Sequence, residues 1–544
     1  MITLFSRRAM LPLIVIFCLL FVSNNIRKIP LHSSVQFYKF VSQVPIPLKT
    51  NNESPIHLAL PKSSHGGNTD PTTQNSQIPL KKIPSALLEF TACSLSPNRY
   101  TNHIRLPNLL YNISMSPKSG EAFDNRTFWN PTILALPYWA KNQYLLISMV
   151  TPDADPYRRN VMCEANICYP KSQKPKTTRE RTCSDEDLAF LGRNGGLRCV
   201  NPPVELNVPP TPAAKCDGEA QVFSDIPGFH DPRIFYTGRG EPILMMSSQS
   251  QYACIGLWVL DLRALYPQLN NLFSSSPKRL GPGPVISYPT LTELTKNPSS
   301  ARQPYEKNWV IFSTSPSTSY IQYEVNSSSR TIAKLIGGGL TTTNITSPLE
   351  QSCLLPPTAS ELESGKYKES AKWHQTTPSL KLILCTRGNK TCHNQPENAV
   401  FIALIQRKNL NAWNLPTRYE RFVVVWSADP PFNMLAMSKY PLLMSNETTS
   451  GWTAEETWDD VPEGGKDGNG EMYGEEREHW GVFTYTTSIA WAWGREEGDI
   501  REKGTGFLDD EVVLSVGVDD VGMVFAKVLV SESLVCLRVC PGAD

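Results

Sequence analysis

Short apolar runs recur along the chain between about residues 125 and 530, and most are bounded by Pro, Gly, Asn or Ser. Runs of this length, rich in Val, Ile, Leu and aromatic residues and separated by turn formers, are typical of β-strands joined by loops. The clearest runs are Tyr144–Val150, Ile243–Met246, Trp309–Phe312, Leu382–Leu384, Phe422–Trp426 and Val512–Val516. The pattern therefore predicts a body that consists mainly of strands.

Helical periodicity is scarce. The best candidates are Ser184–Leu191, with Ser184 as an N-cap, and Leu260–Leu272. A doubly wound sheet needs a helix after most strands, and those helices are missing. We therefore expect an all-β fold, and a β-propeller with long loop insertions fits this length and punctuation.

The amino terminus predicts entry into the secretory pathway. Arg7 and Arg8 precede fourteen mostly apolar residues, Ala9–Val22. This run is shorter than the roughly 17 to 25 residues that span a bilayer, and it matches a signal-peptide core. We favour an uncleaved signal anchor, which would make the chain a single-pass type II membrane protein of the Golgi. A cleaved signal and a secreted protein remain the alternative.

Composition divides the rest of the chain. Residues 24–85 are rich in Asn, Ser, Pro and Thr, which indicates a disordered stem, and residues 453–479 form an acidic, glycine-rich loop. The expected organisation is a cytosolic tail (1–8), an anchor (9–23), a stem (24–85) and a lumenal body (86–544). The net charge is +1, with 52 basic and 51 acidic residues, which gives no electrostatic case for a nucleic-acid partner.

Cysteines and glycosylation sequences agree with a lumenal body. Twelve cysteines remain besides Cys18, an even number that favours disulfides over a zinc site. Local loops are expected for the pairs Cys163/Cys168, Cys385/Cys392 and Cys536/Cys540. Acceptor sequences for N-linked glycans occur at Asn52, Asn112, Asn125, Asn326, Asn344, Asn389 and Asn446.

The tripeptide Asp231-Pro232-Arg233 places a carboxylate and a guanidinium between a turn and an apolar strand. Pro232 is expected to hold Asp231 extended, so that Asp231, Arg233 and Phe235 share one face of the strand. The structural alternative is an Asp-Pro turn with a salt-bridged Arg.

Five segments in the same order carry a family resemblance. They are Trp129-Asn130-Pro131-Thr132-Ile133, His230-Asp231-Pro232-Arg233, Glu306-Lys307-Asn308-Trp309-Val310, Trp373-His374-Gln375-Thr376-Thr377-Pro378-Ser379 and Gly504-Thr505-Gly506-Phe507-Leu508-Asp509-Asp510-Glu511. Together they resemble the five-bladed β-propeller glycosidases and phosphorylases that act on β-mannosides, and the related fungal β-mannosyltransferases. The resemblance implies five blades. His230 stands where those enzymes usually carry an acid.

The resemblance also implies roles for single residues. Asp231 would be the catalytic acid, and Glu306 would contribute to substrate binding. Arg233, Lys307 and His374 would hold phosphate or nucleotide-phosphate oxygens, and Asp509 and Asp510 would bind sugar hydroxyls. Structural alternatives exist for several of them: Lys307 could pair with Glu306 at the surface, His374 could be a core histidine, and Asp509 or Asp510 could simply cap a turn.

The function that we expect is transfer of a glycosyl group from a nucleotide sugar to a glycan, without metal or other cofactor. A glycoside hydrolase or phosphorylase acting on β-mannosides is the alternative, as is a propeller that binds glycans without turnover. A different enzyme class stays open because Asp153-Ala154-Asp155 follows a strand, the place where many nucleotide-sugar transferases bind a divalent metal.

Overall fold

The computed structural model contains two compact units, Met1–Gln77 and Ile78–Asp544, and every residue described lies in the second. The predicted tail, anchor and acidic loop, and the predicted stem up to residue 82, fall outside the described residues. No helix in the described part is long and apolar enough to cross a membrane. The structure describes residues 83–97, 103–116, 126–150, 156–173, 180–212, 216–274, 286–325, 330–346, 353–354, 372–393, 396–409, 418–447, 484–492 and 504–540.

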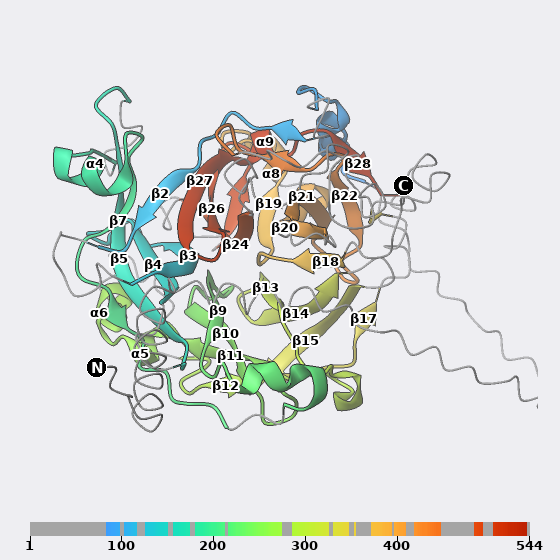
Figure 1. The fold of residues 1–544 in the computed structure, drawn as a ribbon. Coiled ribbons are helices and arrows are strands. Elements are labelled where there is room, and N and C mark those ends of the chain that lie inside the picture. Colours follow the sequence, from blue (N-terminus) through green and yellow to red (C-terminus); the bar gives the residue numbers. More distant parts are fainter. Residues whose placement is uncertain are drawn as a thin grey trace, which may run out of the picture. The chain divides into compact units, whose positions relative to one another are not determined.

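Strands dominate the second unit, and most of them belong to five successive antiparallel meanders among the described residues. Figure 1 shows the meanders around a common centre, with β3, β9, β13, β18 and β24 nearest to it. The first three meanders contain β3 (Phe128–Ala135), β4 (Tyr144–Val150) and β5 (Arg159–Tyr169); β9 (His230–Tyr236), β10 (Pro242–Gln249), β11 (Ile255–Asp261) and β12 (Thr292–Glu293); and β13 (Val310–Ser315), β14 (Thr318–Val325), β15 (Arg330–Gly337), β16 (Leu340–Thr341) and β17 (Ile345–Thr346).

The last two meanders lie in different sheets, and the fifth shares its sheet with the first. The fourth contains β18 (Lys372–Gln375), β19 (Leu380–Ile383), β20 (Ala399–Asn409), β21 (Arg418–Ser427), β22 (Met434–Ser438) and β28 (Leu537–Val539), with β1 (Ile104–Arg105), β23 (Leu442–Leu443) and β25 (Thr505–Phe507) at its edges. The fifth contains β24 (Thr484–Trp491), β26 (Glu511–Val518), β27 (Gly522–Leu529) and β2 (Tyr111–Ser114).

The apolar runs are continuous because both faces of each sheet are covered by neighbouring sheets. In β4, Leu146 packs into one core cluster whereas Leu145 and Ile147 pack into the next. In β10, Leu244 and Met246 share that second cluster, while Ile243 and Met245 face a third. Side chains that alternate between two dry interfaces produce an uninterrupted apolar sequence. The expectation of an all-β, propeller-like fold is confirmed.

Strand β2 joins the two ends of the chain's sheet system. It pairs antiparallel with β27 of the fifth meander and parallel with β7 (Gly196–Cys199), which is attached to β5 of the first meander together with β6 (Arg181–Thr182) and β8 (Val204–Glu205). Strand β2, which begins at Tyr111, therefore pairs with a strand that ends at Leu529, more than four hundred residues later in the chain.

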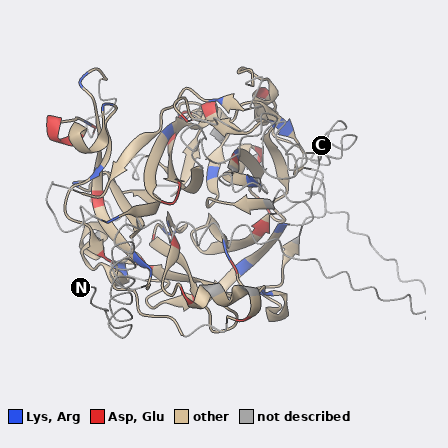
Figure 2. Cartoon of the chain, viewed as in Figure 1, with Lys and Arg blue, Asp and Glu red and all other residues tan. Residues whose placement is uncertain are grey.

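Helices are short. Helix α4 (Asp185–Leu191) follows Ser184, whose side chain accepts from the Asp187 backbone in a capping box, as predicted. Its acidic first turn is visible in Figure 2, where charges of both signs are otherwise scattered over the sheets. The predicted helix Leu260–Leu272 is wrong as one element, because β11 continues to Asp261 and Pro267 separates α5 (Leu262–Leu265) from α6 (Gln268–Ser274).

The remaining helices and 3-10 turns lie in connections and near the ends of the body. They are α3 (Ser85–Leu88), α8 (Lys390–His393), α9 (Val530–Ser533), η1 (Glu89–Thr91), η2 (Gly218–Ser224), η3 (Ser299–Ala301) and η5 (Pro396–Asn398). Ile83 and Leu87 belong to the largest core cluster, so the packed body already includes residues just before position 86.

Six disulfides use all twelve cysteines of the body, but only one of the three local pairs predicted is present. Cys163 and Cys168 both lie on β5, where five intervening steps of extended chain hold them about 16 Å apart. Cys536 and Cys540 likewise flank β28. The bonds are Cys93–Cys536, Cys163–Cys199, Cys168–Cys183, Cys216–Cys254, Cys353–Cys540 and Cys385–Cys392.

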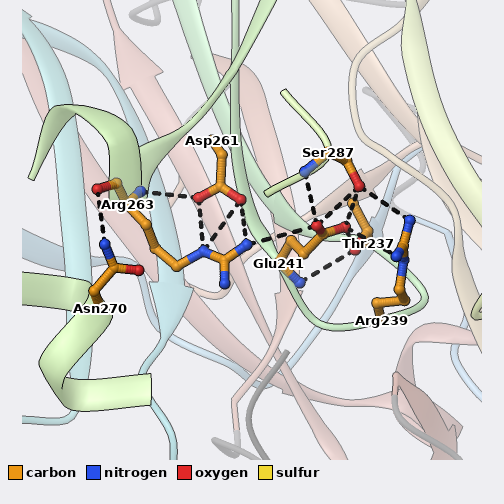
Figure 3. Close-up of polar contacts among 7 residues, drawn as sticks. All are labelled: Thr237, Arg239, Glu241, Asp261, Arg263, Asn270 and Ser287. Carbon is orange, nitrogen blue, oxygen red and sulfur yellow. Dashed lines mark hydrogen bonds and ion pairs between the residues drawn. The ribbon is translucent and has the colours of Figure 1, made fainter. Parts of the chain in front are cut away.

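A buried ion network anchors the outer part of the second meander (Figure 3). The guanidinium of Arg263 donates to both oxygens of Asp261, with Nε–Oδ1 2.9 Å and Nη2–Oδ2 2.6 Å, and lies 3.5 Å from Glu241. Glu241 also accepts from the backbone and the hydroxyl of Ser287. The Arg263, Asp261 and Glu241 side chains are at most 1% exposed, so each charge depends on the others.

Removing the central cation of this network should destabilise the body strongly. Arg263→Leu leaves two buried carboxylates without their counterion, and we expect the free energy of unfolding to fall by about 3–5 kcal/mol. Arg239→Leu is the matched control, because the Arg239 side chain is 46% exposed and lies 3.9 Å from Glu241. The control should change stability by less than about 1 kcal/mol. Urea unfolding followed by tryptophan fluorescence measures both, and equal losses would contradict the network's role.

Candidate functional site

The strands nearest the centre begin close to one another, and three of them start beside an Asn or Asp with left-handed backbone. The φ angles are 50° at Asn130, 50° at Asp231 and 60° at Asn308. Asn and Asp adopt this conformation more readily than other residues with a side chain. We call the joined group the inner-strand cluster; its members are Asn130, Asp231, Arg233, Asn308, His374 and Tyr485.

Asp231 does not have the extended backbone expected from the following proline. Its positive φ accompanies a register shift between β9 and β10, where Arg233 faces Met245 and His230 faces Ser247. Such an irregularity turns a side chain away from the strand alternation. The predicted shared face of Asp231, Arg233 and Phe235 is therefore wrong for Asp231. Its Oδ1 instead accepts from Asn130 Nδ2 at 2.8 Å.

Arg233 is 4% exposed and connects three meanders. One terminal nitrogen, Nη2, donates to Asn308 Oδ1 at 2.8 Å, and the other, Nη1, donates to the carbonyl of Thr376. These contacts use two of the five N–H donors of the guanidinium. They hold Arg233 beside Asp231, and its contact with phosphate stays a prediction.

Asn308 is the centre of the remaining contacts. Its Oδ1 also lies 3.3 Å from the Tyr485 hydroxyl, and its Nδ2 lies 3.4 Å from His374 Nδ1. Because an amide nitrogen can only donate, His374 Nδ1 is the acceptor in this pair. Burial raises the pKa of Tyr485 to about 12, so its hydroxyl stays a donor. The predicted residue His374 therefore lies in the cluster, from β18.

His230, which replaces the acid of the resembled enzymes, is buried and neutral. Burial lowers its pKa to about 4, with the charge of Asp231 opposing and those of Lys307 and Arg158 adding to the effect. Its Nε2 lies 2.9 Å from the carbonyl of Ile226, which can only accept, so Nε2 carries the proton. His230 is a fixed, uncharged neighbour of Asp231.

The side chains of Glu306 and Lys307 have different surroundings in the structure. Glu306 accepts from the Gln303 backbone at 2.8 Å and from the Trp309 indole at 3.1 Å, and burial raises its pKa. It shapes the turn before β13. The Lys307 ammonium lies 4.8 Å from the centre of the Phe223 ring, and its charge acts on both His230 and Asp520. Lys307 thus lies within electrostatic reach of the cluster.

Asp509 and Asp510 are not brought to the cluster. They precede β26, where Asp510 pairs with Arg387 at 2.7 Å and Asp509 accepts from the Arg387 backbone. The eight residues of β26 carry the chain about 25 Å to its other end. There the turn residues Asp519 and Asp520 occupy the end of the sheet that faces Asp231.

Asp520 is the carboxyl group that the sequence analysis missed. Burial and, next, the negative charge of Asp231 raise its pKa to about 6. The same two carboxylates act on Tyr419, whose pKa burial raises well above the ordinary value and whose ring contacts Tyr485 at 4.8 Å between centroids. Val518-Asp519-Asp520-Val521-Gly522 has the composition of an ordinary hairpin turn, so nothing in it indicated a site.

A weak internal repeat could have located the cluster. Trp129-Asn130-Pro131-Thr132-Ile133 and His230-Asp231-Pro232-Arg233-Ile234 share an Asn or Asp, a proline and an isoleucine at the same spacing. Lys307-Asn308-Trp309-Val310-Ile311 keeps the first and last of these positions. The shared Asn or Asp is the residue with positive φ in each case.

One other feature lies apart from the cluster. A groove of about 670 Å³ between η1, β1 and α9 has mainly apolar walls that include Phe90, Leu95 and Leu534. Within the described residues, no group of three or more His, Cys, Asp or Glu is arranged to hold a metal ion. The Asp153-Ala154-Asp155 segment lies outside them, so the metal-dependent alternative stays a prediction.

Comparisons with known proteins place the chain near no characterised family. No family model matches, and no curated protein matches. Solved structures with similar arrangements include a candidate glycoside hydrolase from Parabacteroides distasonis (TM-score 0.37, 10% identity, covering 80% of this chain and 97% of that one). Two others are a family 43 glycoside hydrolase from Bacillus licheniformis (0.26, 10%, 74% and 70%) and an α-L-arabinofuranosidase from Fusarium graminearum (0.27, 10%, 78% and 98%). TM-scores this low carry no argument about activity, which has to rest on the site.

The raised pKa of Asp520 predicts a pH-dependent gain in stability when its charge is removed. Between about pH 4 and pH 6 the folded chain holds a proton that the unfolded chain has released, so folding becomes less favourable as pH rises through this window. Asp520→Asn should therefore be more stable than the wild type by about 1–3 kcal/mol at pH 8 and equally stable at pH 4. Thermal unfolding across this pH range measures the difference, and a pH-independent one would refute it.

Proposed function

We propose that this chain is a glycan-active enzyme whose five meanders are the blades of a β-propeller, with its reaction centre at the inner-strand cluster. The proposal rests on one observation above all. Asp231 and Asp520 come from different meanders, interact electrostatically, and occupy an environment that keeps a proton on Asp520 up to about pH 6. Cleavage of a glycosidic bond requires two carboxyl groups, one of which can supply a proton.

The pair would divide the two proton transfers of the reaction. One carboxyl group donates a proton to the departing oxygen, and the other accepts a proton from the incoming nucleophile. We assign the two proton transfers to these carboxyl groups together and keep Asp231 as the member indicated by the sequence motif. Asn130 would hold the Asp231 carboxylate in place, and Arg233 would hold the strand behind it.

Within this class we propose cleavage of β-mannosides by water or phosphate as the reaction. Transfer from a nucleotide sugar is the second candidate, favoured by the predicted anchor at residues 9–23 and the stem that follows. Products distinguish the three routes, since hydrolysis releases mannose, phosphorolysis releases mannose 1-phosphate, and transfer extends an acceptor glycan.

Replacing either carboxyl group should remove turnover without unfolding the chain. Asp231→Asn keeps the oxygen that accepts from Asn130 but cannot donate or accept the reacting proton. Turnover of a β-mannoside should fall about 10²- to 10⁴-fold, and Asp520→Asn should fall within the same range. Chromatography of the sugar products, together with the melting temperature of each variant, measures both effects.

Asp509→Asn is the matched control, because Asp509 is exposed and lies at the far end of β26. It should leave turnover unchanged. A loss in the control equal to that in Asp520→Asn would move the site to the other end of the sheet. If neither the wild type nor any variant turns over a donor while all of them bind mannosides equally, the non-catalytic glycan-binding alternative replaces the enzyme.

We also propose that the body works in the lumen of the secretory pathway, anchored by residues 9–23. Six disulfides support an oxidising compartment. The full-length protein should then resist carbonate extraction and lose mass on removal of N-linked glycans. Recovery of a soluble chain that begins near Asn24 would replace the anchor by a cleaved signal while leaving the lumenal location in place.

A further inference from the structure

Arg158 is a buried cation beside the proposed catalytic pair. Its backbone nitrogen donates to Pro227 at 2.7 Å, and its carbonyl accepts from Phe229, two residues before Asp231. Gly228 permits this close approach, because its φ is 105° and a Cβ there would lie 2.3 Å from the Arg158 carbonyl oxygen. Arg158 is 8% exposed. Its backbone therefore lies in the interior, next to the segment that leads to Asp231.

The guanidinium of Arg158 differs from three other buried guanidinium groups of this chain. Arg198, Arg263 and Arg421 each have a carboxylate partner, at 3.1, 2.6 and 3.0 Å respectively. Arg158 has no carboxylate partner among the described residues, and its buried Nε has no hydrogen-bond partner there. An arginine keeps its charge in any environment, so a buried one without a counterion is costly.

The surroundings of Arg158 match a ligand that carries negative charge. Its guanidinium carbon lies 5.6 Å from the centre of the half-buried Trp129 ring, directly before Asn130 of the cluster. Lys307 supplies a second cation, since both Arg158 and Lys307 act on His230. Two cations beside a candidate glycosidic site can bind an oxyanion, and an indole can hold a guanidinium in place over its face. The site is therefore suited to a sugar that carries an anionic group or reacts with an anion.

We propose that Arg158, with Lys307, forms an oxyanion subsite of the inner-strand cluster, which binds either free phosphate or the carboxylate of an acidic sugar. The inference rests on the proposed function for the location of the substrate, but the binding of the anion does not depend on turnover. Phosphate in this subsite would be the nucleophile of phosphorolysis, whereas a carboxylate would select uronic acid residues in the glycan.

Calorimetric titration of the full-length protein with inorganic phosphate, glucuronate or mannose tests the subsite. We expect one of the two anions to bind the wild type, and Arg158→Gln to weaken that binding by about 10- to 100-fold, the effect of losing hydrogen bonds to a charged group. Arg158→Lys keeps the charge and should lose less. The anion that binds identifies the source, and each titration is repeated in Asp231→Asn, which should bind the anion even though it lacks turnover.

Arg159→Gln is the matched control, because the neighbouring Arg159 already pairs with Glu205 at 2.7 Å and its side chain is 40% exposed. It removes the same charge one residue away and should bind the anion as the wild type does. The proposal is overturned if neither anion binds, if mannose alone binds, or if the two Gln variants lose binding equally. It is also overturned if Arg158→Gln melts well below Arg159→Gln in anion-free buffer, since that would reveal a partner within the chain.

Discussion

The hydrogen bonds of Arg233 are the constraint on which the candidate site depends. A guanidinium that is 4% exposed must have its donors satisfied, and here the acceptors come from Asn308 and Thr376, in the segments that lead into the next two meanders. Each of those segments is thereby held against the start of β9. The left-handed backbone at Asp231 lies two residues away, and there the carboxylate accepts from Asn130 instead of following the strand.

The sequence predicted the strands well because their chemistry is local. Val512–Val516 and Tyr144–Val150 are each apolar apart from one serine, and short runs of this kind are typical of strands covered on both faces. Helix α4 was equally readable, since Ser184 and Asp187 supply a complete cap. The conformation of Asp231 was not readable. The preference of a residue before proline describes an average, and here the register shift between β9 and β10 overrides it.

Features that depend on the path of the chain in space were harder to predict. Cys163 and Cys168 are close in sequence, yet β5 separates them and brings in Cys199 and Cys183 from later segments. Asp510 and Asp520 both stand next to apolar strands, but the direction of β26 decides which of them reaches the cluster. His374 and Lys307 were found because their motif lies at the start of a central strand, where side chains from several sheets meet.

The place of β2 sets an order for the assembly of the body. Residues 111–114 leave the ribosome about four hundred residues before β27, the strand with which they pair in the fifth meander. The first meander offers them an edge earlier, through β7. An early strand can thus pair on one side only until synthesis of β27 supplies its second partner. The same holds for Cys93, whose partner Cys536 is 443 positions away. Oxidation of that pair therefore reports that the segment before β28 has reached the residues that follow η1.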